Sequence, residues 1–265
     1  MKKRLIEELK ITAGCLLLMA ACVFLGIFIK SAYDHMKGRE EYDTLRDSVS
    51  VTEDADEGRT ETVAEKKEET KPKNLVVNWD DLFAKNSDYV GWLEMAGNIS
   101  YPVVKSTNNS FYLSKGFSKE YNVNGSIFMH CDCQADWSSR NTVLYGHNMF
   151  DGSMFGGIEK FRNGDYLRAN DTIYVHVKGG KRVYKVFDCI FTEDITEPYN
   201  VSILTDEETG AFIQAMKRMS SVWVEENMPS QEDNILTLST CVGRVGTTHR
   251  QIIQAKYVGT TPYKE

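Results

Sequence analysis

The chain has 265 residues, which is enough for one sizeable domain with additional segments. Apolar residues make up 42% of it, which suffices for a buried core, and six cysteines at this length do not indicate a disulfide framework. The formal net charge of −7, without a basic block in the presumed domain, argues against a nucleic-acid partner.

The first thirty residues predict a membrane anchor. Ile11–Ile29 contains no charged residue, and a helix of that length spans roughly 28 Å, about the thickness of a bilayer core. The basic residues among positions 1–10 favour a cytoplasmic N-terminus, with residues 11–30 in the lipid bilayer. A cleaved signal peptide is the alternative, but the apolar run continues past Cys22 to Ile29, which favours an uncleaved type II anchor.

Residues 31–73 are polar and charge-dense, with acidic clusters at Glu53–Glu57 and Glu65–Glu69. Such a segment has too few large apolar residues to bury much surface. We expect its first part to extend the anchor helix and its remainder to form an acidic extracellular linker. A spacer that lifts a catalytic domain off the membrane and a solvated linker without a specific role both fit this composition.

A folded domain is expected over residues 74–265. Asn78–Asn86 predicts a short helix capped by Asn78, and Thr205–Val224 has the spacing of an amphipathic helix capped by Thr205 or Asp206. The other predicted elements are short strands separated by Gly, Asn and Pro, and Gly179-Gly180 marks a hairpin. The predicted strands are Val90–Met95, Pro102–Lys105, Gly125–Met129, Asn141–Tyr145, Tyr166–Ala169, Thr172–Val177, Val183–Thr192, Asn234–Thr240 and Gln251–Val258.

This pattern predicts a mostly β fold with peripheral α-helices, in the form of a mostly antiparallel barrel. Three chemically active residues lie at the ends of its predicted strands: Cys241, His147 and Arg250. A thiol, an imidazole and a guanidinium are the parts of a cysteine acyl-transfer site. From the spacing alone, Cys241 also fits an inert buried cysteine, and His147 fits a histidine satisfied at a strand end.

The residues around the cysteine resemble one family. Thr237–Cys241 resembles the TLxTC signature of the sortases, which are membrane-anchored cysteine transpeptidases of Gram-positive bacteria, and Leu144–Met149 resembles the strand that carries their histidine. The similarity extends over Trp79–Val258, and its details resemble class B. Further similar blocks are Val90–Leu93, Tyr101–Val104, Asn109–Leu113 and Gly125–Met129.

The resemblance implies an eight-stranded β-barrel preceded by N-terminal helices, with Thr205–Val224 as a helix between the sixth and seventh strands. It also implies a reaction. Cys241 attacks the carbonyl after the threonine of a C-terminal sorting signal, and an amine of the peptidoglycan precursor resolves the thioacyl-enzyme. His147 would transfer protons and Arg250 would stabilise the oxyanion. Arg244 is a rival, but the family's arginine begins the final strand, as Arg250 does.

Four further positions correspond to residues that line the sorting-signal groove in class B enzymes: Asn109, Leu113, Tyr145 and Ser239. From the sequence alone, Leu113 fits the core equally well, and Asn109 fits a turn. The resemblance names surface proteins bearing the sorting signal as substrates. No cofactor is expected.

His130–Cys133 departs from the family pattern and contains two cysteines beside a histidine and an aspartate. Such a cluster could bind a metal, but one intervening residue is tight for a zinc site and no second cysteine pair follows. We expect no metal site.

Three other functions remain open. A pilin-polymerising enzyme would use the same residues with a different acceptor amine. An L,D-transpeptidase also pairs Cys with His and Arg, but that family places His-Gly directly before its cysteine, where this chain has Ser239-Thr240. A catalytically silent surface-binding domain would be expected to have lost His147, Cys241 or Arg250, and all three are present.

Overall fold

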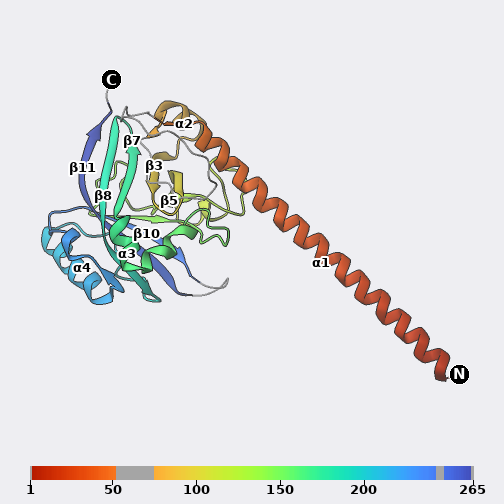
Figure 1. Cartoon of the computed structure of the whole chain (residues 1–265). Coiled ribbons are helices and arrows are strands. Elements are labelled where there is room, and N and C mark those ends of the chain that lie inside the picture. The colour runs from red at the N-terminus through yellow and green to blue at the C-terminus, as the bar shows by residue number, and fades with distance from the viewer. Residues whose placement is uncertain (1, 52–74, 243–247, 264–265) are drawn as a thin grey trace, which may run out of the picture.

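The computed structural model describes residues 2–51, 75–242 and 248–263. Figure 1 shows a β-barrel at one end of a long helix, with the N-terminus at the far end of that helix. Eight strands close the barrel in the order β3-β4-β5-β6-β10-β11-β8-β7, and β7 pairs with β3. The strands are β3 (Tyr89–Met95), β4 (Ile99–Lys105), β5 (Ile127–Met129), β6 (Asn141–Tyr145), β7 (Thr172–Val177), β8 (Gly180–Thr192), β10 (Ile235–Cys241) and β11 (Arg250–Pro262).

The prediction of an eight-stranded barrel is therefore confirmed. Its pairs are antiparallel except for β4–β5 and β6–β10, which run parallel. The long strand β11 pairs along one edge with β10 and along the other with β8, and this double pairing closes the barrel. β7 and β8 form the hairpin expected at Gly179-Gly180, where Gly179 has a φ of +84°.

The predicted helices form where capping residues start them. Asn78 caps α2 (Trp79–Lys85) by accepting a hydrogen bond from the Asp81 amide. Thr205 and Glu208 form a capping box at the start of α4 (Asp206–Met219), which lies between the sixth and seventh barrel strands as expected. α4 ends before the predicted Val224, because β9 (Val222–Trp223) pairs with β8 instead.

One predicted strand is wrong. Tyr166–Ala169 belongs to α3 (Gly164–Ala169), which follows the 3-10 helix η2 (Gly156–Arg162). The side chain of Asn163 accepts hydrogen bonds from the amides of Asp165 and Tyr166 and so starts a helix. The short run Tyr-Leu-Arg-Ala has no pattern that separates strand from helix, and the N-cap before it decides the local structure.

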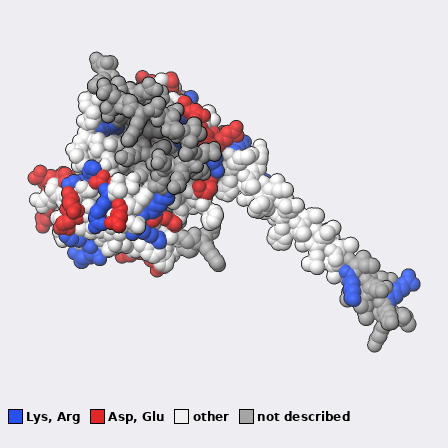
Figure 2. All heavy atoms as spheres, in the orientation of Figure 1, with Lys and Arg blue, Asp and Glu red and all other residues white. Residues whose placement is uncertain are grey.

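The N-terminal helix α1 (Lys2–Asp47) continues well beyond the predicted anchor. Its stretch from Thr12 is long and apolar enough to cross a membrane, and side chains such as Leu17 and Phe28 are about 70% exposed. Figure 2 shows this stretch as a band without charged side chains between the basic residues near the N-terminus and the charged barrel. An apolar surface of this extent requires an apolar covering.

The last turns of α1 pack against the barrel, although the sequence assigned them to the linker. Tyr42, Leu45 and Val49 are at most 7% exposed and belong to the barrel's own hydrophobic core. The short strands β1 (Ser50–Val51) and β2 (Leu75–Val76) then pair with each other. The apolar helix thus reaches the barrel before residue 52. The rest of the predicted linker, residues 52–73, lies outside the described residues, as does Asn74, the first residue of the predicted domain.

A buried carboxyl makes the stability of the barrel depend on pH. Asp188 on β8 is fully buried, and neither of its carboxyl oxygens has a hydrogen-bond partner among the described residues. Burial raises the pKa of Asp188 to about 7. The unfolded chain keeps the ordinary value of about 4. The folded state therefore binds a proton between these values, and this contribution to stability is lost as pH rises through about 7.

We expect Asp188→Asn to remove this dependence, because the amide stays neutral at every pH. The free energy of unfolding of the full chain, measured in detergent by urea titration with tryptophan fluorescence, should fall from pH 5 to pH 8 more steeply in the wild type than in the variant. Equal slopes for the two proteins would show that Asp188 does not titrate in this range.

Candidate active site

Strand register brings the three predicted catalytic residues to one end of the barrel. β6 and β10 run parallel with Tyr145 opposite Ser239, so that His147 and Cys241 each lie two residues beyond this pair. β10 and β11 run antiparallel with Cys241 directly opposite Arg250. Two hydrogen bonds continue the first pairing: the Gly146 amide donates to the Ser239 carbonyl, and the Thr240 hydroxyl donates to the Gly146 carbonyl.

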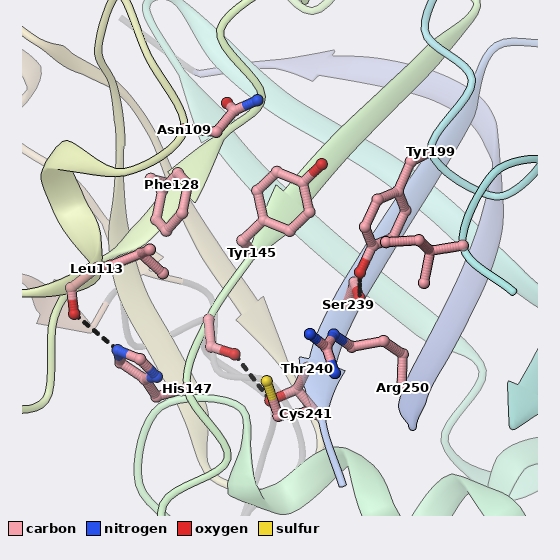
Figure 3. Close-up of a pocket in the computed structure, with 12 residues that line it drawn as sticks. Asn109, Leu113, Phe128, Tyr145, His147, Tyr199, Ser239, Thr240, Cys241 and Arg250 are labelled. Carbon is pink, nitrogen blue, oxygen red and sulfur yellow. Dashed lines mark hydrogen bonds between the residues drawn. The ribbon is translucent and has the colours of Figure 1, made fainter. Parts of the chain in front are cut away.

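A pocket of about 280 Å³ opens at this end. Its walls contain all seven residues that the sequence proposed as catalytic or substrate-binding, and Figure 3 shows how they lie. Cys241 is exposed, while His147 and Arg250 are half-buried, so the thiol is the accessible group. The lining residues are Asn109, Leu113, Phe128, Tyr145, Gly146, His147, Ile195, Tyr199, Ser239, Thr240, Cys241 and Arg250.

The imidazole of His147 is held by a backbone carbonyl. Its Nε2 lies 2.7 Å from the carbonyl oxygen of Leu113, and because a carbonyl can only accept, Nε2 carries the proton. In the neutral ring Nδ1 is then the free base, and in Figure 3 it lies on the side of the ring that faces Cys241. The loop that carries Leu113 therefore sets the tautomer of His147.

The guanidinium of Arg250 is directed toward the thiol side of the pocket (Figure 3). Its Nη1 donates to the carbonyls of Thr248 and His249, each at 3.1 Å, which fixes the side chain beside its own strand. The next residue back, His249, contacts other groups: its Nδ1 lies 3.0 Å from a carboxylate oxygen of Glu193, and its ring stacks on Phe191. The rival Arg244 lies outside the described residues.

Sequence reasoning missed Tyr199, which lines the same pocket. Its hydroxyl shares a hydrogen bond with the Ser239 hydroxyl, and its ring packs edge-on against Tyr145 at 5.2 Å. Burial raises the pKa of Tyr199, while the Ser239 hydroxyl and the Arg250 guanidinium act against that rise. Tyr199 comes from the loop between β8 and α4, and a loop has no periodic pattern that would have marked it.

The four predicted groove residues have different surroundings in the structure. Leu113 is 46% exposed, so it is not a core residue. Asn109 accepts a hydrogen bond from the Cys131 amide at 2.8 Å and so joins the β4–β5 loop to the segment after β5. Tyr145 packs on Phe128 with ring centroids 5.3 Å apart, which makes one wall of the pocket aromatic.

The two cysteines of the unusual segment His130–Cys133 lie in different surroundings. Ligand atoms of His130, Cys131 and Asp132 lie within 4.8 Å of one another, whereas Cys133 is buried and its Sγ accepts from the Val143 amide. The ammonium of Lys105 donates to the Cys131 carbonyl at 2.9 Å, next to this cluster, and positive charge there disfavours a cation. The expectation of no metal site stays a prediction.

Comparison with known proteins shows the family to which the chain belongs. A model of the sortase domain matches residues 96–258. Sortase B of Listeria monocytogenes is 31% identical over 245 residues, which cover 89% of this chain and 94% of that protein.

Solved structures agree. The X-ray structure of Clostridium perfringens sortase B is 29% identical, has a TM-score of 0.63, and is matched over 68% of this chain and 99% of its own. A Staphylococcus aureus sortase B–substrate complex is 30% identical, has a TM-score of 0.63, and is matched over 68% of this chain and 84% of its own. With its closed eight-stranded barrel and its helix before β10, the chain belongs to the sortase family, class B, whose members are cysteine transpeptidases.

Proposed function

We propose that this cysteine transpeptidase cleaves a C-terminal sorting signal after its threonine and transfers the surface protein to an amine of the peptidoglycan precursor. Cys241 is the nucleophile, His147 the acid and base, and Arg250 the oxyanion donor. The observation that carries these roles is the register of β6, β10 and β11. His147 and Cys241 each lie two residues beyond the paired residues of β6 and β10, and Arg250 lies directly opposite Cys241 on β11.

The reaction proceeds in two halves. Nδ1 of His147 takes the proton of the Cys241 thiol, and the thiolate attacks the carbonyl carbon after the threonine. A carbon–sulfur bond forms, and the peptide carbon–nitrogen bond breaks as His147 passes that proton to the leaving amine. The acceptor amine then attacks the thioester and loses its proton to His147. A new carbon–nitrogen bond forms, and the thiolate leaves. In both halves the Arg250 guanidinium faces the negative oxygen of the tetrahedral intermediate.

The pocket supports a peptide substrate. Its apolar and aromatic lining suits extended chain and side chains, while Asn109, Ser239 and the Tyr199 hydroxyl offer a few polar contacts. A similar protein, Staphylococcus aureus sortase B, has been solved as a substrate complex. We assign Asn109, Leu113, Tyr145 and Ser239 to substrate binding on this basis and add Tyr199.

The proposed setting is the outer face of a cell membrane. Residues 1–10 lie inside, residues 11–30 span the bilayer, and the barrel within residues 74–265 lies outside with its substrates. The exposed apolar surface of α1 and the basic residues that precede it support this orientation.

Cys241→Ala should abolish cleavage and transfer without unfolding the protein, because the thiol is exposed and packs little. The assay is cleavage by the full chain of fluorogenic peptides that share a threonine before the scissile bond, with mass spectrometry of the thioacyl-enzyme. Cys131→Ala, which removes a half-buried thiol outside the pocket lining, is the matched control. Activity near the wild-type level in Cys241→Ala would remove this residue from the mechanism.

The two arginines near the thiol should behave differently. Arg250→Ala should lower turnover by about 10²-fold or more, the scale of losing an oxyanion donor. Arg244→Ala should change turnover little, because it does not begin the final strand. Steady-state kinetics with the same peptides compare the two, and the opposite ranking would assign the oxyanion role to Arg244.

The orientation is testable in protoplasts of a Gram-positive host that express the full chain. Added protease should digest the barrel and leave a small membrane-bound N-terminal fragment. A protected full-length chain would place Cys241 on the wrong side of the membrane for its substrates. A mature chain that starts after Ile29 would replace the anchor with a cleaved signal peptide.

A further inference from the structure

The end of α1 is fastened to the loop between β4 and β5. The carboxylate of Glu41 accepts hydrogen bonds from the Ser118 amide at 2.7 Å and from the Asn122 side chain at 2.8 Å. The same Asn122 amide group donates to the carbonyl of Gly38 at 3.1 Å, one turn earlier in the helix. This is the loop that also carries Leu113, whose carbonyl holds His147.

The fit between helix and loop leaves no space. A Cβ atom added at Gly38 would lie 2.3 Å from the Asn122 side-chain oxygen. A Cβ atom added at Gly116 in the loop would lie 2.1 Å from a Glu41 carboxylate oxygen. The atoms met are the ends of the Asn122 and Glu41 side chains, which themselves bond across this contact. A larger residue at either glycine would therefore have to displace one of these hydrogen-bonding groups.

Tyr42 lies at the centre of this contact and is 2% exposed. Its hydroxyl donates to the carbonyl of Gly125 at 2.5 Å, and its oxygen lies 2.9 Å from the Ser126 hydroxyl. Burial raises the pKa of Tyr42, so its hydroxyl remains a proton donor at every physiological pH. Its ring packs edge-on against Tyr101 of β4 at 5.4 Å, which holds the side chain in place independently of the hydroxyl.

Gly125 also lies next to the ring of His147, the proposed acid and base. It has a φ of +57°, and a Cβ atom added there would lie 2.8 Å from the Leu113 carbonyl oxygen and 3.0 Å from Cδ2 of His147. The adjoining Ser126 amide donates to the Tyr112 carbonyl at 3.0 Å, which ties the two arms of the loop together. A single residue thus separates the Tyr42 hydroxyl from the carbonyl that orients His147.

We propose that Tyr42 is a positioning residue for the transpeptidase: through Gly125 its hydroxyl fixes the Leu113 carbonyl and thereby the orientation of His147. The inference rests on the proposed role of His147 as acid and base. It makes the helix that tethers the enzyme a part of its catalytic framework, because the contact is made by α1 and not by the barrel. Tyr42 itself does not line the pocket.

Tyr42→Phe tests the inference, because it removes the hydroxyl and keeps the ring. In the full chain in detergent we expect kcat to fall about tenfold with KM nearly unchanged, the effect of losing one buried hydrogen bond of about 1.4 kcal/mol. The ¹⁵N shifts of His147, assigned by their loss in His147→Gln, should move away from a single Nε2-protonated tautomer. Tyr89→Phe is the matched control, since Tyr89 is 1% exposed and its hydroxyl has no partner among the described residues.

These measurements distinguish a failure of the inference about Tyr42 from a failure of the proposed function. Unchanged kcat in Tyr42→Phe, or a lower melting temperature with unchanged ¹⁵N shifts of His147, would overturn the inference and leave Tyr42 a packing residue. A wild-type chain that neither cleaves nor transfers any threonine peptide would instead refute the proposed function. The ¹⁵N shifts from the same samples would still decide whether Tyr42 orients the ring.

Discussion

The active end of this protein depends on the register of β10. This strand pairs in parallel with β6 and antiparallel with β11, so that one strand sets the relative positions of His147, Cys241 and Arg250. A shift of one residue would turn Cys241 to the opposite face of the strand. The buried side chains of β10 prevent such a shift, because every residue from Ile235 to Thr240 is buried. The same packing that stabilises the barrel therefore sets the geometry of the proposed chemistry.

Strand ends position the proposed reacting groups, while loops contact those groups and line the pocket around them. The Leu113 carbonyl selects the tautomer of His147, and Tyr199 links Ser239 to the Arg250 side of the pocket. Neither contact involves neighbours in sequence. A rigid barrel with loops gathered at one end allows the peptide pocket to differ between enzymes while the strand ends keep the same chemistry.

The sequence predicted the features that depend on short patterns. Most strands, the two capped helices and the candidate residues at the ends of β6, β10 and β11 follow from local alternation, caps and motif spacing. The strand prediction for Tyr166–Ala169 is wrong because four residues are too few to show a period, and the N-cap at Asn163 lies outside them. Tyr199 and the docking of Tyr42 depend on contacts between segments far apart in the chain, which no local pattern encodes.

In the proposed membrane setting, the continuity of α1 would also determine how far from the lipid the enzyme works. Tyr42 lies thirteen residues after Ile29 in the same helix, and at 1.5 Å per residue the two are about 20 Å apart along its axis. With the anchor in the bilayer, a helix locked at Tyr42 would hold the mouth of the pocket at a nearly constant height, within a few turns of the membrane surface. A scissile bond would then have to lie at that height to be reached. The length of polypeptide between a substrate's own membrane segment and its threonine would thereby become part of what the enzyme recognises.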